Sequence, residues 1–265
     1  MEAINKFYLI NGKVDEVKNF INTNENGSII YEVLRVINGN PAFLDAHIER
    51  MKKSFEIINK KFPFTNEELI SYVNKVIDSN DNIVGNIKIT YNTASEELKV
   101  YYIKHSYPKD ELYKDGVKTI LYYGERENPN AKIVNSTFRE RVTEEIKKEN
   151  AFEAILVDRN GFITEGSKSN IFAIEDGKVV TAKGEAVLKG ITREKIMKIA
   201  EQIGLEVEEK DIKASDIKNL EAMFISGTSP KILPIAFVGE IKLDVNNLVL
   251  RKLMKAYDEL LSGKI

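Results

Sequence analysis

A lysine and a glutamate stand in contexts that suit covalent and proton-transfer chemistry. Lys132 lies in "NPNAKIVNS", a strand-like stretch in which the residues at 131, 133 and 134 are small or apolar. Burial among such residues disfavours the charged ammonium, and a neutral amine is the form that Schiff-base chemistry needs. Glu165 lies in "TEGSKSNIF", at the far end of an expected hairpin. Taken singly, either residue could be an ordinary solvated side chain.

Three other segments offer groups that could bind an anion. Ile191 and Thr192 follow a glycine at the start of an expected helix, where free N–H groups and the helix dipole favour negative charge. "FISGTSPKILP" contains a polar turn with Thr228 and Ser229, and Arg50 adds a guanidinium beside the apolar stripe of another helix. A lysine for an imine, a carboxylate for a pyridinium proton and donors for a phosphate are together what pyridoxal phosphate chemistry requires.

Asn-Gly and Asp-Gly pairs predict tight turns between many of the strands. They stand at 11–12, 38–39, 160–161 and 176–177, between apolar and β-branched segments. Glycine adopts the left-handed backbone of such turns at little cost. Strands are expected at 6–10, 29–37, 42–45, 86–92, 97–104, 153–158, 162–166, 169–174 and 178–182. Because these strands pair locally, the sheets should be largely antiparallel or mixed.

Apolar periodicity predicts helices between the groups of strands. The expected helices span 45–58, 65–77, 137–150, 192–204 and 246–261. Asp45 is expected to cap the first, and Thr65 with Glu68 has the spacing of a capping box at the start of the second. Gly204 is expected to end the fourth helix.

A polar, proline-containing stretch at 104–116 is the best candidate for a domain boundary. We expect a smaller N-terminal α/β domain over 1–116, a linker over 117–130 and a larger C-terminal, cofactor-binding domain over 131–265. The predicted fold class is therefore mixed, α+β or α/β, with two domains.

The composition excludes several classes of protein and of site. The 265 residues carry a formal net charge of −2, which gives no basic excess for nucleic acid. No apolar run approaches the roughly 20 residues of a membrane helix, and the N-terminus lacks a secretory pattern, so the expected compartment is the cytoplasm. The absence of cysteine excludes thiolate sites, and with only two histidines we expect no metal.

The chain resembles the class IV aminotransferases, the fold-type IV pyridoxal phosphate family. Its signature is present as Glu165, "NIF" at 170–172, Thr181 and "LKGITR" at 188–193, all at family spacing. Weaker likeness covers "IIYEVLRV" at 29–36, "AHIERM" at 46–51, "AKIVN" at 131–135 and "SGTSPKILP" at 226–234. The resemblance implies the two-domain fold of this family, pyridoxal 5'-phosphate as cofactor, small amino and keto acids as substrates, and a homodimer.

The resemblance also implies a role for each candidate residue. Lys132 resembles the lysine that binds the cofactor covalently and moves the proton at the substrate Cα, and Glu165 resembles the partner of the pyridine nitrogen. The implied phosphate ligands are Arg50, Ile191, Thr192 and Thr228. The implied substrate-binding residues are Tyr31, Arg35, Tyr91 and Ser229.

The resemblance leaves the substrate more open than the cofactor. D-amino acid aminotransferases carry an arginine in a Thr-Arg-Gly stretch, whereas the comparable strand here is "ITYNT" at 89–93. We therefore predict transfer from an apolar, branched-chain-like L-amino acid to 2-oxoglutarate. An aminodeoxychorismate lyase releasing pyruvate and 4-aminobenzoate stays open, since "ENPNAKIVN" would also suit it. A D-amino acid aminotransferase and a non-catalytic relative that binds the cofactor stay open as well.

Overall fold

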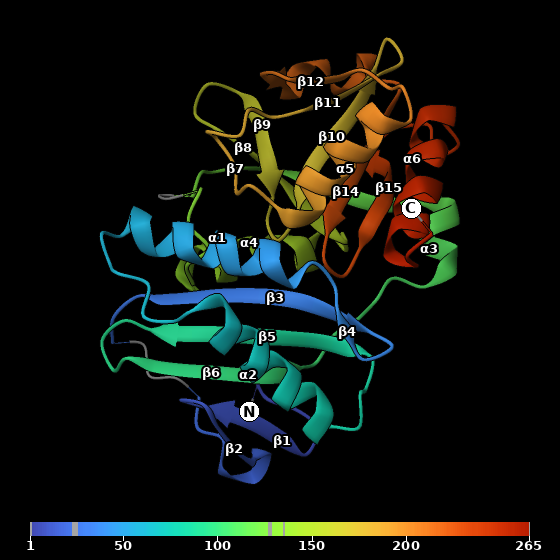
Figure 1. Ribbon diagram of the computed structural model, residues 1–265. Helices are drawn as coiled ribbons and strands as arrows, with labels where there is room; N and C mark the ends of the chain where they lie inside the picture. The colour runs from blue at the N-terminus through green and yellow to red at the C-terminus, as the bar shows by residue number, and fades with distance from the viewer. Residues whose placement is uncertain (1, 23–25, 127–128, 135, 265) are drawn as a thin grey trace. The chain divides into compact units, whose positions relative to one another are not determined.

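The chain forms two compact units, each with its own sheet and core. The structure is a computed structural model, and it describes residues 2–22, 26–126, 129–134 and 136–264 (Figure 1). Unit 1 comprises Met1–Ser106 and Ala131–Val134, and unit 2 comprises Tyr107–Asn130 and Asn135–Ile265.

Unit 1 is built on a six-stranded sheet in the order β2-β1-β6-β5-β3-β4, in which every pairing is antiparallel. Ile48, Met51 and Phe55 of the first helix pack against Ile30 and Leu34 of the sheet to form its main core. The elements are β1 (Phe7–Ile10), β2 (Lys13–Glu16), η1 (Val17–Asn19), β3 (Ile29–Ile37), β4 (Asn40–Pro41), α1 (Leu44–Ile57), α2 (Asn66–Ser79), β5 (Gly85–Asn92) and β6 (Glu97–Ile103).

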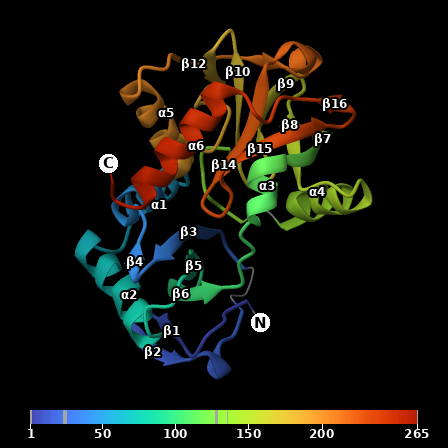
Figure 2. The ribbon, with the colours of Figure 1, turned by 90° about the vertical axis from the view of Figure 1, so that its right-hand side faces the viewer.

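Unit 2 contains a ten-stranded mixed sheet in the order β12-β11-β10-β14-β15-β7-β8-β9-β13, with β16 paired to β15. Helices α5 and α6 pack against each other beside β14 and β15 (Figure 2). The strands are β7 (Val117–Tyr123), β8 (Glu153–Val157), β9 (Phe162–Gly166), β10 (Asn170–Glu175), β11 (Lys178–Thr181), β12 (Val207–Glu209), β13 (Ile212–Lys213), β14 (Ala222–Gly227), β15 (Lys231–Val238) and β16 (Ile241–Lys242). The helices are α3 (Asp110–Asp115), α4 (Ser136–Lys148), α5 (Ile191–Gln202), η2 (Ala214–Asn219) and α6 (Leu248–Leu261).

The fold class is confirmed: helices mix with one antiparallel and one mixed sheet. In three of the predicted turns both central residues have positive φ, at 11–12, 38–39 and 176–177. The capping box of Thr65 and Glu68 is also present at the start of α2. The strand expected at 42–45 is wrong, because α1 begins at Leu44 and Phe43 is its N-cap, with a left-handed backbone (φ 58°). Asp45 lies in the first turn of α1 and does not cap it.

The boundaries between the two units differ from the expected domain boundaries. The expected linker at 117–130 begins with β7, which pairs in parallel with both β15 and β8 inside the sheet of unit 2. The segment 131–134 belongs to unit 1, because it runs antiparallel along the free edge of β3. Neither pairing leaves a local mark in the sequence, since the partners lie far apart along the chain.

Candidate active site

The segment 131–134 is hydrogen-bonded along one edge of β3, which places Lys132 next to Tyr31. Tyr31 N–H donates to the Lys132 carbonyl (3.0 Å), and Val134 N–H donates to the Ile29 carbonyl (3.1 Å). Lys132 N–H donates to Ser54 Oγ (3.2 Å), which ties the segment to α1. The Lys132 amine lies 4.7 Å from the centroid of the Tyr31 ring. Three hydrogen bonds thus fix the main chain around the lysine predicted to be catalytic, and its amine lies over an aromatic face.

A buried cluster of three ionisable side chains lies between β3 and α1. The Glu32 carboxylate accepts hydrogen bonds from Arg50 Nε (2.8 Å) and Nη2 (2.6 Å), and lies 2.7 Å from His47 Nδ1. Burial by itself would raise the pKa of Glu32, but the Arg50 guanidinium and His47 outweigh it and lower the pKa to about 2. Burial lowers the pKa of His47, so its neutral ring donates Nδ1–H to Glu32. The cluster therefore fixes the direction of the Arg50 guanidinium.

Glu32 is not among the predicted site residues, although the sequence carries a signal for it. Its strand reads "IIYEVLRVI", and position 32 falls on the same face as Ile30 and Leu34, which lie in the core. A carboxylate at a core-facing position needs a charged partner. That requirement could have linked Glu32 to Arg50 before the structure was known.

Replacing Glu32 with glutamine should destabilise the protein at pH 7. The Arg50 guanidinium would remain buried without its counter-charge, a loss that typically costs about 3–5 kcal/mol of unfolding free energy. Denaturant unfolding of Glu32→Gln and of the exposed control Glu49→Gln measures this cost. Folding lowers the pKa of Glu32, so the ionised carboxylate stabilises the folded protein. This stabilisation is complete at pH values above 4.5, the pKa of the unfolded state, and is lost as the pH falls toward 2. Equal stability of the two variants would contradict a stabilising role for the cluster.

Strands β3 and β5 place the expected substrate residues on two different faces of the sheet. Tyr31 is opposite Thr90 in the ladder, so Tyr91 lies on the other face from Tyr31. The Tyr91 ring packs in the core, 5.1 Å from the ring centroid of Phe55. Tyr31 and Arg35 do share a face, since they are four positions apart on one strand. The structure thus does not bring Tyr91 together with Tyr31, because alternation along β5 turns its ring toward the core.

The Glu165 carboxylate in unit 2 is buried and held by two donors. Glu165 is the penultimate residue of β9 and is 3% exposed. Arg126 Nη1 donates to its Oε1 and Leu188 N–H donates to its Oε2, each at 3.1 Å. A guanidinium and an amide both favour an ionised carboxylate. Arg126 gave no signal in the sequence, since only the tertiary fold brings it to Glu165.

Leu188, which donates to Glu165, also connects it to the start of α5. Asn170 Nδ2 donates to the Leu188 carbonyl (2.8 Å), and a Cβ at Gly190 would collide with Asn170 Oδ1. Gly190 is the N-cap of α5 and makes no side-chain capping bond, so the first amides of the helix have no side-chain cap. Thr192 is buried in the first turn, with its Oγ1 3.5 Å from the Tyr257 hydroxyl.

The polar turn between β14 and β15 adjoins this region. Ser226 pairs with Asn170 in the ladder of β14 and β10, so the turn that holds Thr228 and Ser229 begins next to Asn170. Ser226 is 1% exposed, and its Oγ has no hydrogen-bond partner within the described ranges. Unit 2 therefore brings together Glu165, the start of α5 and the turn at 228–229.

Each unit offers groups that suit pyridoxal 5'-phosphate. Unit 2 offers a fixed carboxylate for a pyridinium nitrogen, helix amides without a capping side chain, and an orphaned buried hydroxyl in Ser226. Unit 1 offers the anchored amine of Lys132 and the oriented guanidinium of Arg50. The asparagine at position 135, part of the Lys-x-x-Asn likeness, lies outside the described residues.

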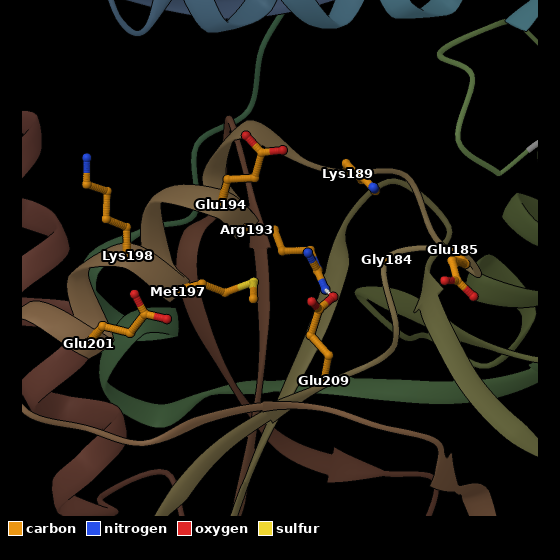
Figure 3. Close-up of a pocket in the computed structure, with 9 residues that line it drawn as sticks. All are labelled: Gly184, Glu185, Lys189, Arg193, Glu194, Met197, Lys198, Glu201 and Glu209. Atoms are coloured by element: carbon orange, nitrogen blue, oxygen red, sulfur yellow. Dashed lines mark hydrogen bonds and ion pairs between the residues drawn. The ribbon is translucent and has the colours of Figure 1, made fainter.

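A cavity of about 450 Å³ adjoins α5, and Lys189, Arg193 and Glu209 are among the residues that line it (Figure 3). Arg193 projects into it, where its guanidinium donates to Glu209 and to the Ala182 carbonyl. Neither Ile191 nor Thr192 lines it. Over the described part of the chain, no group of three His, Asp or Glu residues is placed to hold a metal ion. Within the same part, no helix is long and apolar enough to cross a membrane.

Comparison with known proteins places the chain in a family. The family model "Amino-transferase class IV" matches residues 29–238. A D-alanine aminotransferase of Bacillus licheniformis is 28% identical over 225 residues, which is 80% of this chain and 79% of the relative. A branched-chain-amino-acid aminotransferase of Pseudomonas aeruginosa is 29% identical over 244 residues, covering 83% and 78%. The structure of the T.th. branched-chain amino acid aminotransferase with pyridoxamine 5'-phosphate is similar in fold, with a TM-score of 0.89, 21% identity, and coverage of 100% and 96%. The chain therefore belongs to the class IV aminotransferases and is a pyridoxal phosphate-dependent aminotransferase.

Proposed function

We propose that the enzyme moves an amino group from an apolar, branched-chain-like L-amino acid to 2-oxoglutarate. The observation that carries the proposal is the absence of arginine from β5, the strand that pairs with β3 beside Tyr31. The single basic residue of β5 is Lys88, whose amine is bound to Glu2 (2.5 Å) and lies over the Tyr31 ring (5.4 Å). β5 thus supplies no guanidinium for a substrate α-carboxylate, and we assign that carboxylate to the turn at 226–229.

The residues of the site divide the catalytic work between them. The bound cofactor supplies an electron-accepting pyridinium ring. Lys132 removes and returns the proton at the substrate Cα, since its segment is fixed by backbone hydrogen bonds to β3 and α1. Glu165 holds the proton of the ring nitrogen, and Arg126 holds the Glu165 carboxylate in place by donating to its Oε1. Arg50, the first amides of α5 and the hydroxyls of Thr192 and Thr228 bind the phosphate.

The side-chain preference should be broad within the apolar amino acids. Ile29, Tyr31 and Val33 alternate onto one face of β3 and would contact the substrate side chain. Apolar pockets discriminate by roughly 1–3 kcal/mol per methylene. Leucine, isoleucine and valine should therefore be used at overlapping rates.

A D-amino acid donor is the second candidate. The relative from Bacillus licheniformis is named a D-alanine aminotransferase and covers most of this chain. Against this candidate stands the strand "ITYNT", which lacks the arginine of the D-specific enzymes.

The two candidates are separated by half-reactions of the holoenzyme. The enzyme is mixed with single L- and D-amino acids and with aminodeoxychorismate, and the cofactor absorbance is followed. We expect conversion by L-leucine, L-isoleucine and L-valine, with glutamate formed when 2-oxoglutarate is added. Faster conversion by D-alanine would favour the second candidate. Rapid pyruvate release from aminodeoxychorismate, with no glutamate from any branched-chain donor, would indicate a lyase.

Arg35 should select the acceptor. It shares the face of Tyr31 on β3, where a guanidinium can pair with the second carboxylate of 2-oxoglutarate. Arg35→Ala should therefore raise the KM for 2-oxoglutarate more than the KM for apolar keto acids, by about tenfold for the loss of one charge-assisted hydrogen bond. Lys6→Ala, which removes an exposed charge from the same unit, is the control. An equal effect on both acceptors would exclude this role.

We also propose that the enzyme is a homodimer. The family resemblance supports this assembly. Sedimentation at working concentration should give about twice the chain mass of 30.1 kDa. A fully active species with the mass of one chain would contradict the dimer.

A further inference from the structure

The turn 167–169 connects Glu165 to Asn170. It joins the end of β9 to the start of β10, and the Gly166 N–H donates across it to the Ser169 carbonyl (2.8 Å). A Cβ at Gly166 would collide with Ser169 Oγ, so only glycine allows so close an approach. The position of this turn therefore sets the positions of Glu165 and Asn170.

One buried carboxylate binds every residue of this turn. Glu153, the first residue of β8, is 6% exposed. Its Oε1 accepts from Ser167 N–H (3.1 Å), from Ser167 Oγ–H and from its neighbour Ala154 N–H (2.9 Å). Its Oε2 accepts from Ser169 Oγ–H (3.0 Å) and, at a longer distance, from Lys168 N–H (3.4 Å). These donors are amides and hydroxyls, and no cation in the described ranges forms an ion pair with Glu153.

The turn closes a circuit of hydrogen bonds within the site. Leu188 N–H donates to Glu165 on one side of the turn. Asn170, on the other side, donates to the Leu188 carbonyl and packs closely against Gly190, where α5 begins. If the turn moves, Glu165 and Asn170 move apart, and Leu188 cannot satisfy both. The separation between the Glu165 carboxylate and the start of α5 thus depends on the anchoring of the turn.

We propose that Glu153 is a positioning residue that holds the Glu165 carboxylate in register with the start of α5. A carboxylate is needed there because five donors converge on two oxygens, and an amide would present its own N–H groups to some of them. The inference rests on the proposed roles of Glu165 and of α5 in binding the cofactor.

The Leu188 amide reports the position of Glu165 directly, because its hydrogen bond goes to Glu165 Oε2. Hydrogen exchange at Leu188 is measured by NMR on the cofactor-free protein, so the readout does not depend on catalysis. In Glu153→Met, which keeps the side-chain length but has no oxygen acceptor, exchange at Leu188 should accelerate by about tenfold, as expected for one hydrogen bond to a charged group. Glu153→Gln keeps one acceptor oxygen and should give an intermediate rate. Amides of β3 and α1 should keep their wild-type rates.

The matched control is Glu175→Met, at the far end of β10, which removes a carboxylate that pairs with Lys210. Its Leu188 amide should exchange as in the wild type. Unchanged exchange at Leu188 in a folded Glu153→Met, or equal acceleration of all amides, would overturn the inference. If Glu153→Met does not fold, Ser167→Ala and Ser169→Ala must each accelerate Leu188, and wild-type rates in both would equally overturn it.

A second measurement separates this inference from the proposed function. The single-turnover rate of the holoenzyme with saturating L-leucine is measured, and it should fall at least tenfold in Glu153→Met. If Leu188 responds and the rate does not, Glu153 positions Glu165 as inferred, and the role proposed for Glu165 at the ring nitrogen fails instead.

Discussion

Lys132→Ala should fold normally and lose all transamination, because Lys132 is the group that we propose moves the proton at the substrate Cα. The alanine variant keeps the backbone hydrogen bonds that join the segment to β3 and α1, since these use main-chain atoms of residue 132. Borohydride treatment followed by peptide mapping should find the cofactor attached to the peptide of Lys132 in the wild type and to no peptide in the variant.

Lys88→Ala is the matched control for that experiment. Lys88 also has its amine over the ring of Tyr31, at 5.4 Å against 4.7 Å for Lys132. Its removal therefore tests the loss of a nearby positive charge without the loss of the reactive amine. A covalently attached cofactor in Lys132→Ala, or its loss in Lys88→Ala, would show that the reactive lysine has been assigned wrongly.

Glu165→Gln should slow turnover by about 10²–10⁴-fold, the range typical for the loss of a positioned acid–base group. The amide oxygen can still accept the Leu188 N–H, so the local structure should survive. The negative charge that stabilises the pyridinium proton is lost, together with the ion pair between Glu165 and Arg126. The measurement is single-turnover kinetics with saturating L-leucine, together with cofactor affinity, which should change little because the phosphate contacts remain.

The exposed pair of Glu125 and Arg159 provides a control for this charge change. Glu125→Gln also removes a carboxylate from an arginine, with an Nε–Oε1 distance of 3.0 Å, but on the surface. It should keep the wild-type rate. Wild-type turnover by Glu165→Gln would refute the assignment of Glu165 to the ring nitrogen.

The candidate site residues with the clearest signal in the sequence lie close together along the chain. Glu165, Ile191 and Thr192 lie within one signature of about thirty residues, and unit 2 brings them together through Leu188 and Asn170. Helices α1, α2, α4, α5 and α6 and about half of the strands were also predicted, because their apolar periodicity is local.

The residues that hold the signature in place were not predictable in this way. Glu32, Arg126 and Glu153 are defined by partners that lie 14 to 39 positions away, so no local pattern marks them. The separation of Tyr91 from Tyr31 was unpredictable for a related reason, because the register of β5 against β3 decides which face of the sheet each side chain occupies. A shift of one residue in this register would place Tyr91 on the same face as Tyr31.

The placement of 131–134 along the edge of β3 has a consequence for biosynthesis. β3 and its edge partner are separated by about one hundred positions, which a ribosome adds in roughly 5–20 s. During that interval the nascent sheet of unit 1 has an uncovered edge at Ile29–Tyr31, and uncovered edges recruit other strands. A protein truncated at the expected boundary near residue 116 would lack 131–134, so this edge of β3 would stay uncovered. A recombinant fragment ending there should therefore self-associate, whereas one that carries 131–134 on a short tether should not.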